Sequence, residues 1–173
     1  SGKSDYAQRR AEAIPGQHFF LATCPVVDTE MDDRIQRHQK DRQNGLWQTI
    51  EEEQDIAGVI EKLPHGSICL LDCITLWVNN VMYGAELSNE EFSEDIMQIQ
   101  VTQLLKSAES YDGTLFCVSN EVGMGVVPDN PTARKYRDCV GRCNRLLATA
   151  ADEVILVSCG LPLFFKEPQE ENE

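Results

Sequence analysis

Short apolar runs alternate with longer amphipathic stretches along most of the chain. Runs rich in aliphatic and aromatic residues, and one segment of alternating apolar and polar residues, have the length of β-strands. The predicted strands cover residues 18–23, 46–51, 67–72, 114–119 and 153–158, the last of them closed by Cys159-Gly160.

Apolar residues at helical spacing predict a helix between most of these strands. The predicted helices run from Ser4 to Pro15-Gly16, over 54–63, over 74–83, from a Ser-x-x-Glu capping box at 88–91 to about Tyr111, and from Asn130-Pro131 to about Ala151. A further helix is predicted to begin at Asp28 or Thr29, with Met31, Ile35 and His38 on one face.

Strands that alternate with helices predict an α/β fold, a mostly parallel sheet flanked by helices, in a single domain over 1–173. Ligands of such sheets bind beyond the carboxyl ends of the strands. Thr23, Asp72 and the pair Asn120-Glu121 occupy those ends, so we expect one active edge.

Composition narrows the classes of function. The chain has 173 residues with 15 Lys+Arg against 29 Asp+Glu, a formal net charge of −14, which argues against a nucleic-acid-binding face. No apolar run is long enough to span a membrane. The seven cysteines, an odd number, are expected to be free thiols of a cytoplasmic protein. Cys139 and Cys143 have i, i+4 spacing but no partner Cys/His pair nearby, which favours core packing over a zinc site.

Two features suggest nucleotide chemistry. Ser1-Gly2-Lys3-Ser4 matches the second half of the phosphate-binding loop G-x-x-x-x-G-K-[ST], in which Lys3 would contact phosphates and Ser4 would ligate Mg²⁺. The alternatives are a remnant of cloning or a serine cap on an exposed helix. Asp72, at the end of a buried strand, is the carboxylate such a site needs near its Mg²⁺; the alternative is a carboxylate that starts a turn.

Two further segments carry candidate chemistry. Arg34, His38 and Arg42 share one helical face, where cations favour a neutral, nucleophilic imidazole and attract phosphate; the alternative is a solvated helix of mixed charge. Residues 120–128 (NEVGMGVVP) leave a strand end with two closely spaced glycines, as expected for a ligand loop or for a tight connection.

Together these motifs resemble the bifunctional adenosylcobinamide kinase/adenosylcobinamide-phosphate guanylyltransferase family of cobalamin biosynthesis. The resemblance runs over nearly the whole chain, and its most specific parts are the R-I-Q-x-H helix that ends at His38 and residues 120–128. Other matching segments are 1–4, 21–23, 30–42, 47–51, 71–77, 137–138, 141–144 and 151–154.

The resemblance implies a P-loop NTPase-like (RecA-like) fold whose N-terminal strand is missing from this sequence. It implies ATP- or GTP-dependent phosphorylation of adenosylcobinamide, then transfer of GMP from GTP to adenosylcobinamide phosphate through guanylylated His38. It also implies Mg²⁺ at Ser4 and Asp72, and a homotrimer. The implied nucleotide contacts are Ser1, Gly2, Lys3, Ser4, Ala22, Thr23, Cys24, Gln39, Lys40, Asp41, Arg42, Glu51 and Asp72.

Two other functions stay open on sequence alone. One is a kinase of another small alcohol, which would use Lys3 and Asp72 but not His38. The other is a nucleotide-binding regulatory protein without transfer chemistry. No residue is identified as the base for the kinase step, although Glu121 is a candidate.

Overall fold

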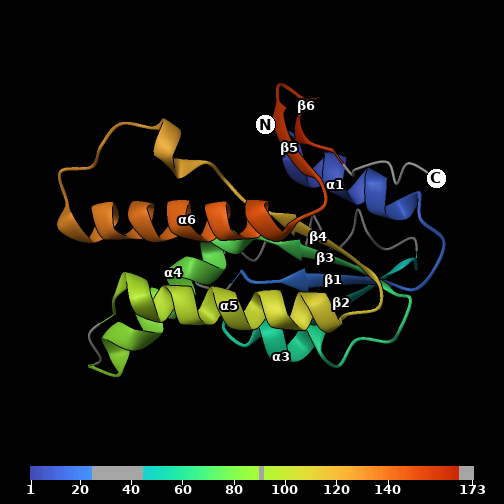
Figure 1. The fold of residues 1–173 in the computed structure, drawn as a ribbon, viewed down its shortest axis with the longest axis horizontal. Coiled ribbons are helices and arrows are strands. Elements are labelled where there is room, and N and C mark those ends of the chain that lie inside the picture. The colour runs from blue at the N-terminus through green and yellow to red at the C-terminus, as the bar shows by residue number, and fades with distance from the viewer. Residues whose placement is uncertain (25–44, 90–91, 168–173) are drawn as a thin grey trace.

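A four-stranded parallel sheet forms the centre of the computed structural model, which describes residues 1–24, 45–89 and 92–167 (Figure 1). Its strands are β1 (His18–Ala22), β2 (Trp47–Glu51), β3 (Ile68–Asp72) and β4 (Thr114–Val118), in the order β2-β1-β3-β4. All the pairings within this sheet are parallel. The first four predicted strands are therefore confirmed, and so is the mostly parallel α/β fold.

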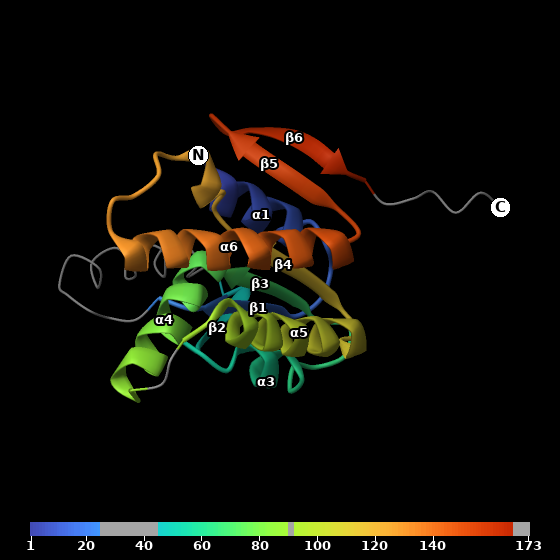
Figure 2. The same cartoon turned by 60° about the vertical axis from the view of Figure 1, so that its left-hand side comes forward.

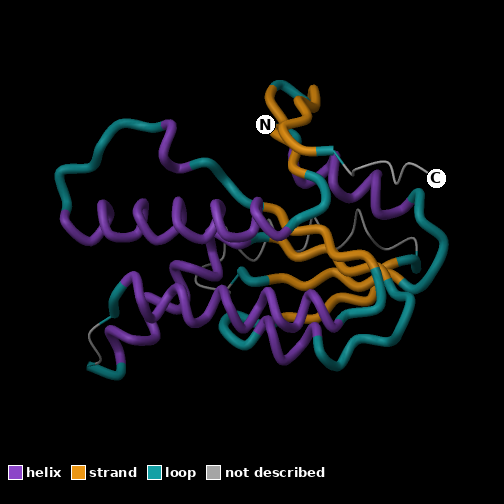
Figure 3. The backbone as a smooth tube through the Cα atoms, viewed as in Figure 1, coloured by secondary structure: helices purple, strands orange, loops and turns teal. Residues whose placement is uncertain are grey.

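Helices connect and cover the strands (Figure 3). They are α1 (Lys3–Glu12), α3 (Ile56–Ile60), α4 (Ile74–Leu87), α5 (Glu94–Ser110) and α6 (Pro131–Ala150), with a 3-10 turn η1 (Val122–Met124). The start of α6 is as predicted, because the Asn130 side chain accepts the N–H groups of Thr132 and Ala133. The helix predicted from Asp28 or Thr29 lies outside the described residues. Among the described helices, none is long and apolar enough to cross a membrane.

The predicted capping box at 88–91 is wrong. Helix α4 continues to Leu87, and Ser88 caps its C-terminus. The next helix, α5, begins instead after Ser93, whose hydroxyl accepts the N–H of Ile96 at 3.3 Å. Both serines precede acidic residues, so local sequence did not distinguish them. Helix α3 is also shorter than the predicted 54–63.

The two faces of the parallel sheet pack against different helices. Cys69 and Leu71 of β3 join a large core that includes buried side chains of α3, α4, α5 and α6. Leu70, which lies between them, belongs to a smaller cluster on the opposite face, where Ala7 of α1 packs. Figures 1 and 2 both show α1 on one side of the sheet and α3 and α5 on the other.

A separate antiparallel hairpin follows α6. It consists of β5 (Val154–Ser158), close to the last predicted strand, and β6 (Leu161–Lys166), which was not predicted. Cys159 and Gly160 form the two-residue turn with φ of 52° and 78°, the positive values that tight hairpins favour. The turn lacks the usual Asn-Gly or Asp-Gly signal, and β6 contains a proline, so the pattern did not indicate a hairpin.

Candidate active site at the carboxyl edge of the sheet

The predicted active edge is a row of four residues in register across the sheet. Ala22 at the end of β1 pairs with Glu51 of β2 on one side and with Asp72 of β3 on the other, and Asp72 pairs with Val118 of β4. Neighbouring strands lie about 4.8 Å apart, so Glu51 and Asp72 occupy positions about 10 Å apart across Ala22. The sheet therefore brings both predicted carboxylates to one edge.

Side-chain alternation assigns these carboxylates to the α1 face. Asp72 lies two residues after Leu70, which packs in the cluster that contains Ala7 of α1. Glu51 lies four residues after Trp47, which packs against the same cluster. Since residues an even number apart on a strand share a face, Glu51 and Asp72 point to the side of the sheet that carries α1.

The half phosphate loop leads directly into α1. Gly2 is the N-cap of this helix and has φ 82°, a left-handed conformation that favours glycine. A Cβ on Gly2 would lie 3.2 Å from the Cα of Gly160 in the β5–β6 turn, and the carbonyl of Ser1 accepts the Gly160 N–H at 2.9 Å. No described side chain caps the N-terminus of α1. Its first amides are thus available to an anion, beside Lys3.

Ser4 and Asp72 are chemically suited to Mg²⁺. A hydroxyl in the first turn of α1 and a carboxylate on the α1 face are both hard oxygen ligands, which Mg²⁺ prefers together with water and phosphate oxygens. The described residues contain no cluster of three or more His, Cys, Asp or Glu side chains that could hold a metal without such help. Any Mg²⁺ held by these two oxygens would complete its shell with water and phosphate oxygens.

Thr23, the residue after β1, is fully buried and connects the end of β1 to the end of β3 through hydrogen bonds. Its hydroxyl accepts the Cys73 N–H at 2.9 Å and donates to the Cys73 carbonyl at 2.8 Å. Its own N–H donates to the Asp72 carbonyl at 3.2 Å. The Asp72–Cys73 peptide, which is cis, is held from both sides by this one residue. Thr23 thus fixes the backbone beneath the Asp72 carboxylate.

Asn80 of α4 is a site-forming residue that the sequence analysis missed. Its side chain is buried, and its amide donates to the Thr23 carbonyl at 2.7 Å and to the Glu53 carbonyl at 3.1 Å. Trp77, one turn earlier, donates from its indole N–H to the Gln54 carbonyl at 2.8 Å. Helix α4 therefore holds the segments that follow β1 and β2. In the sequence, the only sign of this role was a polar residue on the apolar face of a predicted helix.

The segment after β4 is held by side chains of α4 and α6. Asn120 donates to the Thr75 hydroxyl at 3.1 Å, and its carbonyl accepts the Asn144 amide at 3.0 Å. Asn144 also accepts from Ser119 at 2.6 Å. The Glu121 side chain that follows is exposed. These contacts place Asn120 close to the start of α4, which directly follows Asp72 and Cys73.

Several predicted site residues lie outside the described part of the chain. They are His38 with the nucleotide contacts Gln39, Lys40, Asp41 and Arg42, all within residues 25–44. The structure describes the other predicted positions. It brings Ala22, Thr23, Cys24, Glu51 and Asp72 together at strand ends, and it places Ser1, Gly2, Lys3 and Ser4 at the start of α1.

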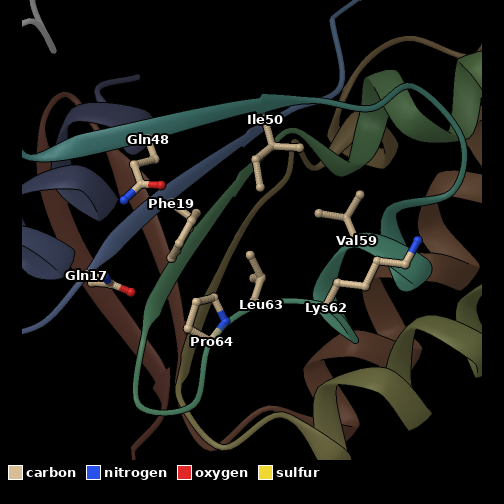
Figure 4. A pocket seen from close by; sticks show the side chains of 8 residues that line it. All are labelled: Gln17, Phe19, Gln48, Ile50, Val59, Lys62, Leu63 and Pro64. Atoms are coloured by element: carbon tan, nitrogen blue, oxygen red, sulfur yellow. The ribbon is translucent and has the colours of Figure 1, made fainter.

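A pocket of about 440 Å³ lies away from this edge, between β1, β2 and α3 (Figure 4). Its walls are largely apolar, with Phe19, Ile50 and Leu63 on opposite sides and Lys62 at the rim. Gln17 and Pro64 mark its position near the amino ends of β1 and β3. No predicted site residue lines it, so the pocket and the carboxyl edge are separate features.

Cys139 and Cys143 pack in the large core rather than at the candidate site. Burial raises the pKa of Cys143 to about 12 and the pKa of Cys139 to about 11. Both side chains are fully buried among the apolar side chains of this core. This supports the core-packing interpretation of their helical spacing.

Comparison with known proteins assigns the chain to a family. The family model described as "Cobinamide kinase / cobinamide phosphate guanyltransferase" matches residues 1–165. The chain belongs to this family. It is therefore an enzyme that combines a kinase and a guanylyltransferase activity, as the resemblance predicted.

Curated relatives agree with this assignment, and each is named a bifunctional adenosylcobalamin biosynthesis protein. The chain is 38% identical over 177 residues to the protein of Salmonella typhimurium and 35% identical over 176 residues to that of Escherichia coli, with 96% of the chain and 94% of each relative covered. A Pseudomonas aeruginosa protein is 31% identical over 167 residues, with 96% and 92% covered.

Proposed function

We propose that the chain carries out both reactions at the carboxyl edge of its sheet. It would first phosphorylate the aminopropanol hydroxyl of adenosylcobinamide with ATP or GTP, and then transfer GMP from GTP to adenosylcobinamide phosphate. The observation that carries this proposal is the placement of Asp72 on the α1 face, where α1 begins with the half phosphate loop. Family membership supports it.

For the kinase step, Lys3 and the free amides of α1 would neutralise the phosphates of the nucleotide. Ser4 and Asp72 would hold Mg²⁺, which supplies further charge neutralisation on the phosphate oxygens when bound. The alcohol oxygen of the aminopropanol arm then attacks the γ-phosphorus, the P–O bond to the nucleoside diphosphate breaks, and the hydroxyl proton is lost. Glu121, exposed just beyond β4, is our candidate acceptor for that proton.

For guanylyl transfer, His38 would be the nucleophile, as the R-I-Q-x-H motif indicates. Its neutral imidazole nitrogen forms a bond to the α-phosphorus of GTP, and the bond to pyrophosphate breaks. A phosphate oxygen of adenosylcobinamide phosphate then attacks the same phosphorus and releases the histidine. Arg34 and Arg42, at i−4 and i+4 from His38, would contact the phosphoryl oxygens.

The remaining predicted nucleotide contacts are proposed for the same edge of the sheet. Glu51, with Ala22, Cys24 and residues 39–42, would contact the guanine nucleotide. We give Thr23 a positioning role instead, because its hydroxyl is already shared with Cys73. We further propose a cytoplasmic homotrimer. The location is supported by free cysteines throughout the chain, and the trimer by the resemblance to the family.

The test is a mass measurement on protein incubated with GTP and Mg²⁺. We expect the intact protein to gain the mass of one GMP, which peptide mapping places on His38. His38→Ala should lose the adduct while keeping kinase activity. His65→Ala is the matched control, since His65 is an exposed histidine at a turn. The His65→Ala protein should still gain the GMP adduct on His38.

Three results would contradict the proposal in different ways. Phosphorylation of an alcohol without a covalent GMP adduct would indicate a simple kinase. GTP binding with neither phosphoryl transfer nor an adduct would indicate a regulatory protein. An adduct that maps to a residue other than His38 would leave the reaction in place but identify a different nucleophile.

A further inference from the structure

The segment after Asn120 presents apolar side chains to solvent. Met124 is 77% exposed, Val126 is 94% exposed and Val127 is 61% exposed. Isolated exposed apolar side chains are ordinary on protein surfaces, but three within four residues form a local patch. We call these three residues the apolar loop. A patch of this kind is typical of a surface that binds a ligand or a partner.

Side chains of α6 hold the apolar loop in place from both ends. Arg137 donates to the Gly123 carbonyl at 2.5 Å. Arg134 donates to the carbonyls of Pro128 and Asp129 at 2.9 Å and 2.6 Å. The loop backbone is thus fixed while its apolar side chains stay exposed. A surface held in this way loses little conformational entropy when a ligand binds.

The apolar loop lies beside the candidate active edge. The segment that leads to it begins after β4, and Asn120 in that segment is hydrogen-bonded to Thr75, three residues after Asp72. In Figure 1 the η1 turn and the loop that leads to α6 extend beyond the end of the sheet. A ligand on the loop would therefore have one end near the phosphate-binding elements.

We propose that the apolar loop contacts the corrin macrocycle of cobinamide. This deepens the proposed function and rests on it, because it assigns part of the acceptor-substrate site. The macrocycle offers a broad face with methyl groups set between the amide groups of its edge, against which exposed apolar side chains can pack. The apolar loop is flanked by Glu121 and Asp129 and by Arg134 and Arg137 of α6, so charges of both signs surround it and its exposed side chains are the apolar feature that distinguishes it.

The nucleotide fits this position less well than the macrocycle does. A triphosphate needs charged groups and hydrogen-bond donors, whereas the exposed side chains of the apolar loop are those of Met124, Val126 and Val127. The loop is therefore assigned to the acceptor, and the start of α1 to the phosphates.

The test compares a triple variant, Met124→Ser/Val126→Ser/Val127→Ser, with the parent enzyme. Loss of three apolar contacts should raise KM for cobinamide at least about tenfold, which corresponds to roughly 1.4 kcal/mol of binding. KM for the nucleoside triphosphate and the amount of GMP bound to the protein from GTP alone should stay unchanged, because neither depends on the corrinoid.

A matched control is Ile99→Ser. Ile99 is 58% exposed on α5, outside the apolar loop and the phosphate-binding elements, and its replacement should leave every kinetic constant unchanged. The sedimentation mass of each protein is measured in parallel. An unchanged KM for cobinamide in the triple variant overturns the proposal. If sedimentation mass falls at the same time, the loop instead contacts a second copy of the chain.

Failure of the proposed function gives a different result. Parent enzyme that neither phosphorylates cobinamide nor accepts GMP from GTP would refute the reaction itself, before any variant is compared. An active parent with an unaffected triple variant refutes only the assignment of the apolar loop.

Discussion

The two faces of the parallel sheet serve different purposes. The face toward α3–α6 carries the large core, in which Leu71, Trp77 and Leu104 are at most 1% exposed. The face toward α1 has a smaller apolar cluster and carries Glu51 and Asp72 at its carboxyl end. Because side chains alternate along a strand, adjacent residues such as Leu71 and Asp72 belong to different faces. Stability and chemistry can therefore be altered separately on one strand.

The largest expected effect comes from the α1 face. Asp72→Asn keeps the shape of the side chain but removes the charge proposed to hold Mg²⁺, so kcat/KM of the kinase reaction should fall by about a hundredfold or more. The urea midpoint should stay close to that of the parent. Asp112→Asn, an exposed aspartate, is the control. Normal kinetics with a lowered midpoint would reverse the roles assigned to the two faces.

A substitution in the large core should lower stability and leave the kinetics of the folded enzyme unchanged. Leu104→Ala on α5 leaves a cavity in the large core and should lower the free energy of unfolding by about 2–5 kcal/mol, with kcat of the folded enzyme unchanged. Ile99→Ala on the same helix removes a side chain that is 58% exposed, and it should cost less than about 0.5 kcal/mol. Chemical denaturation measures both. Equal losses in the two variants would contradict the assignment of Leu104 to the core.

Asn80 links α4, which packs in the large core, to the segments that follow β1 and β2 at the candidate site. Asn80→Ala leaves the Thr23 and Glu53 carbonyls without this donor, so we expect a loss of about 1–3 kcal/mol in stability and a raised KM for the nucleotide. Asn80→Asp should be worse at neutral pH, because it places a buried negative charge against these two carbonyl oxygens. Asn79, exposed next to it, is the matched control. A stability loss with unchanged KM would limit Asn80 to a structural role.

The smallest expected effect concerns the loop after β2. The carboxylate of Glu52 accepts the N–H groups of Gln54 and Asp55 at 2.8 Å and 2.9 Å, and these bonds lower its pKa below the ordinary value of 4.5. A lowered pKa in the folded state stabilises the protein above pH 4.5, and this contribution is lost as pH falls through the folded-state pKa.

Glu52→Gln should therefore cost about 0.5 kcal/mol at pH 7, since the site is partly solvated. Urea titrations at several pH values should show the difference from the parent shrinking in acid. Glu53→Gln makes the same charge change next to it and serves as the control. A difference that grows as pH falls would contradict the sign of the shift.

The sequence predicted the parallel strands well because β1 and β3 are short apolar runs that are buried along most of their length, while β2 shows a clear alternation of apolar and polar residues. It predicted the shared edge too, since the carboxyl ends of parallel strands coincide. It did not predict β6, whose pairing with β5 depends on a turn without the usual residues. The role of Asn80 was missed for a similar reason, because a polar residue on a helix does not reveal which distant carbonyls it meets.

The most direct test of the central claim, that one edge carries both reactions through a guanylylated histidine, is a chase experiment. Protein is labelled from GTP that carries the label in its α-phosphate, freed of nucleotide, and mixed with adenosylcobinamide phosphate. We predict that the label leaves the protein in a single turnover and appears in adenosylcobinamide-GDP. Label that remains on the protein, or product that forms only when fresh GTP is added, would contradict the account.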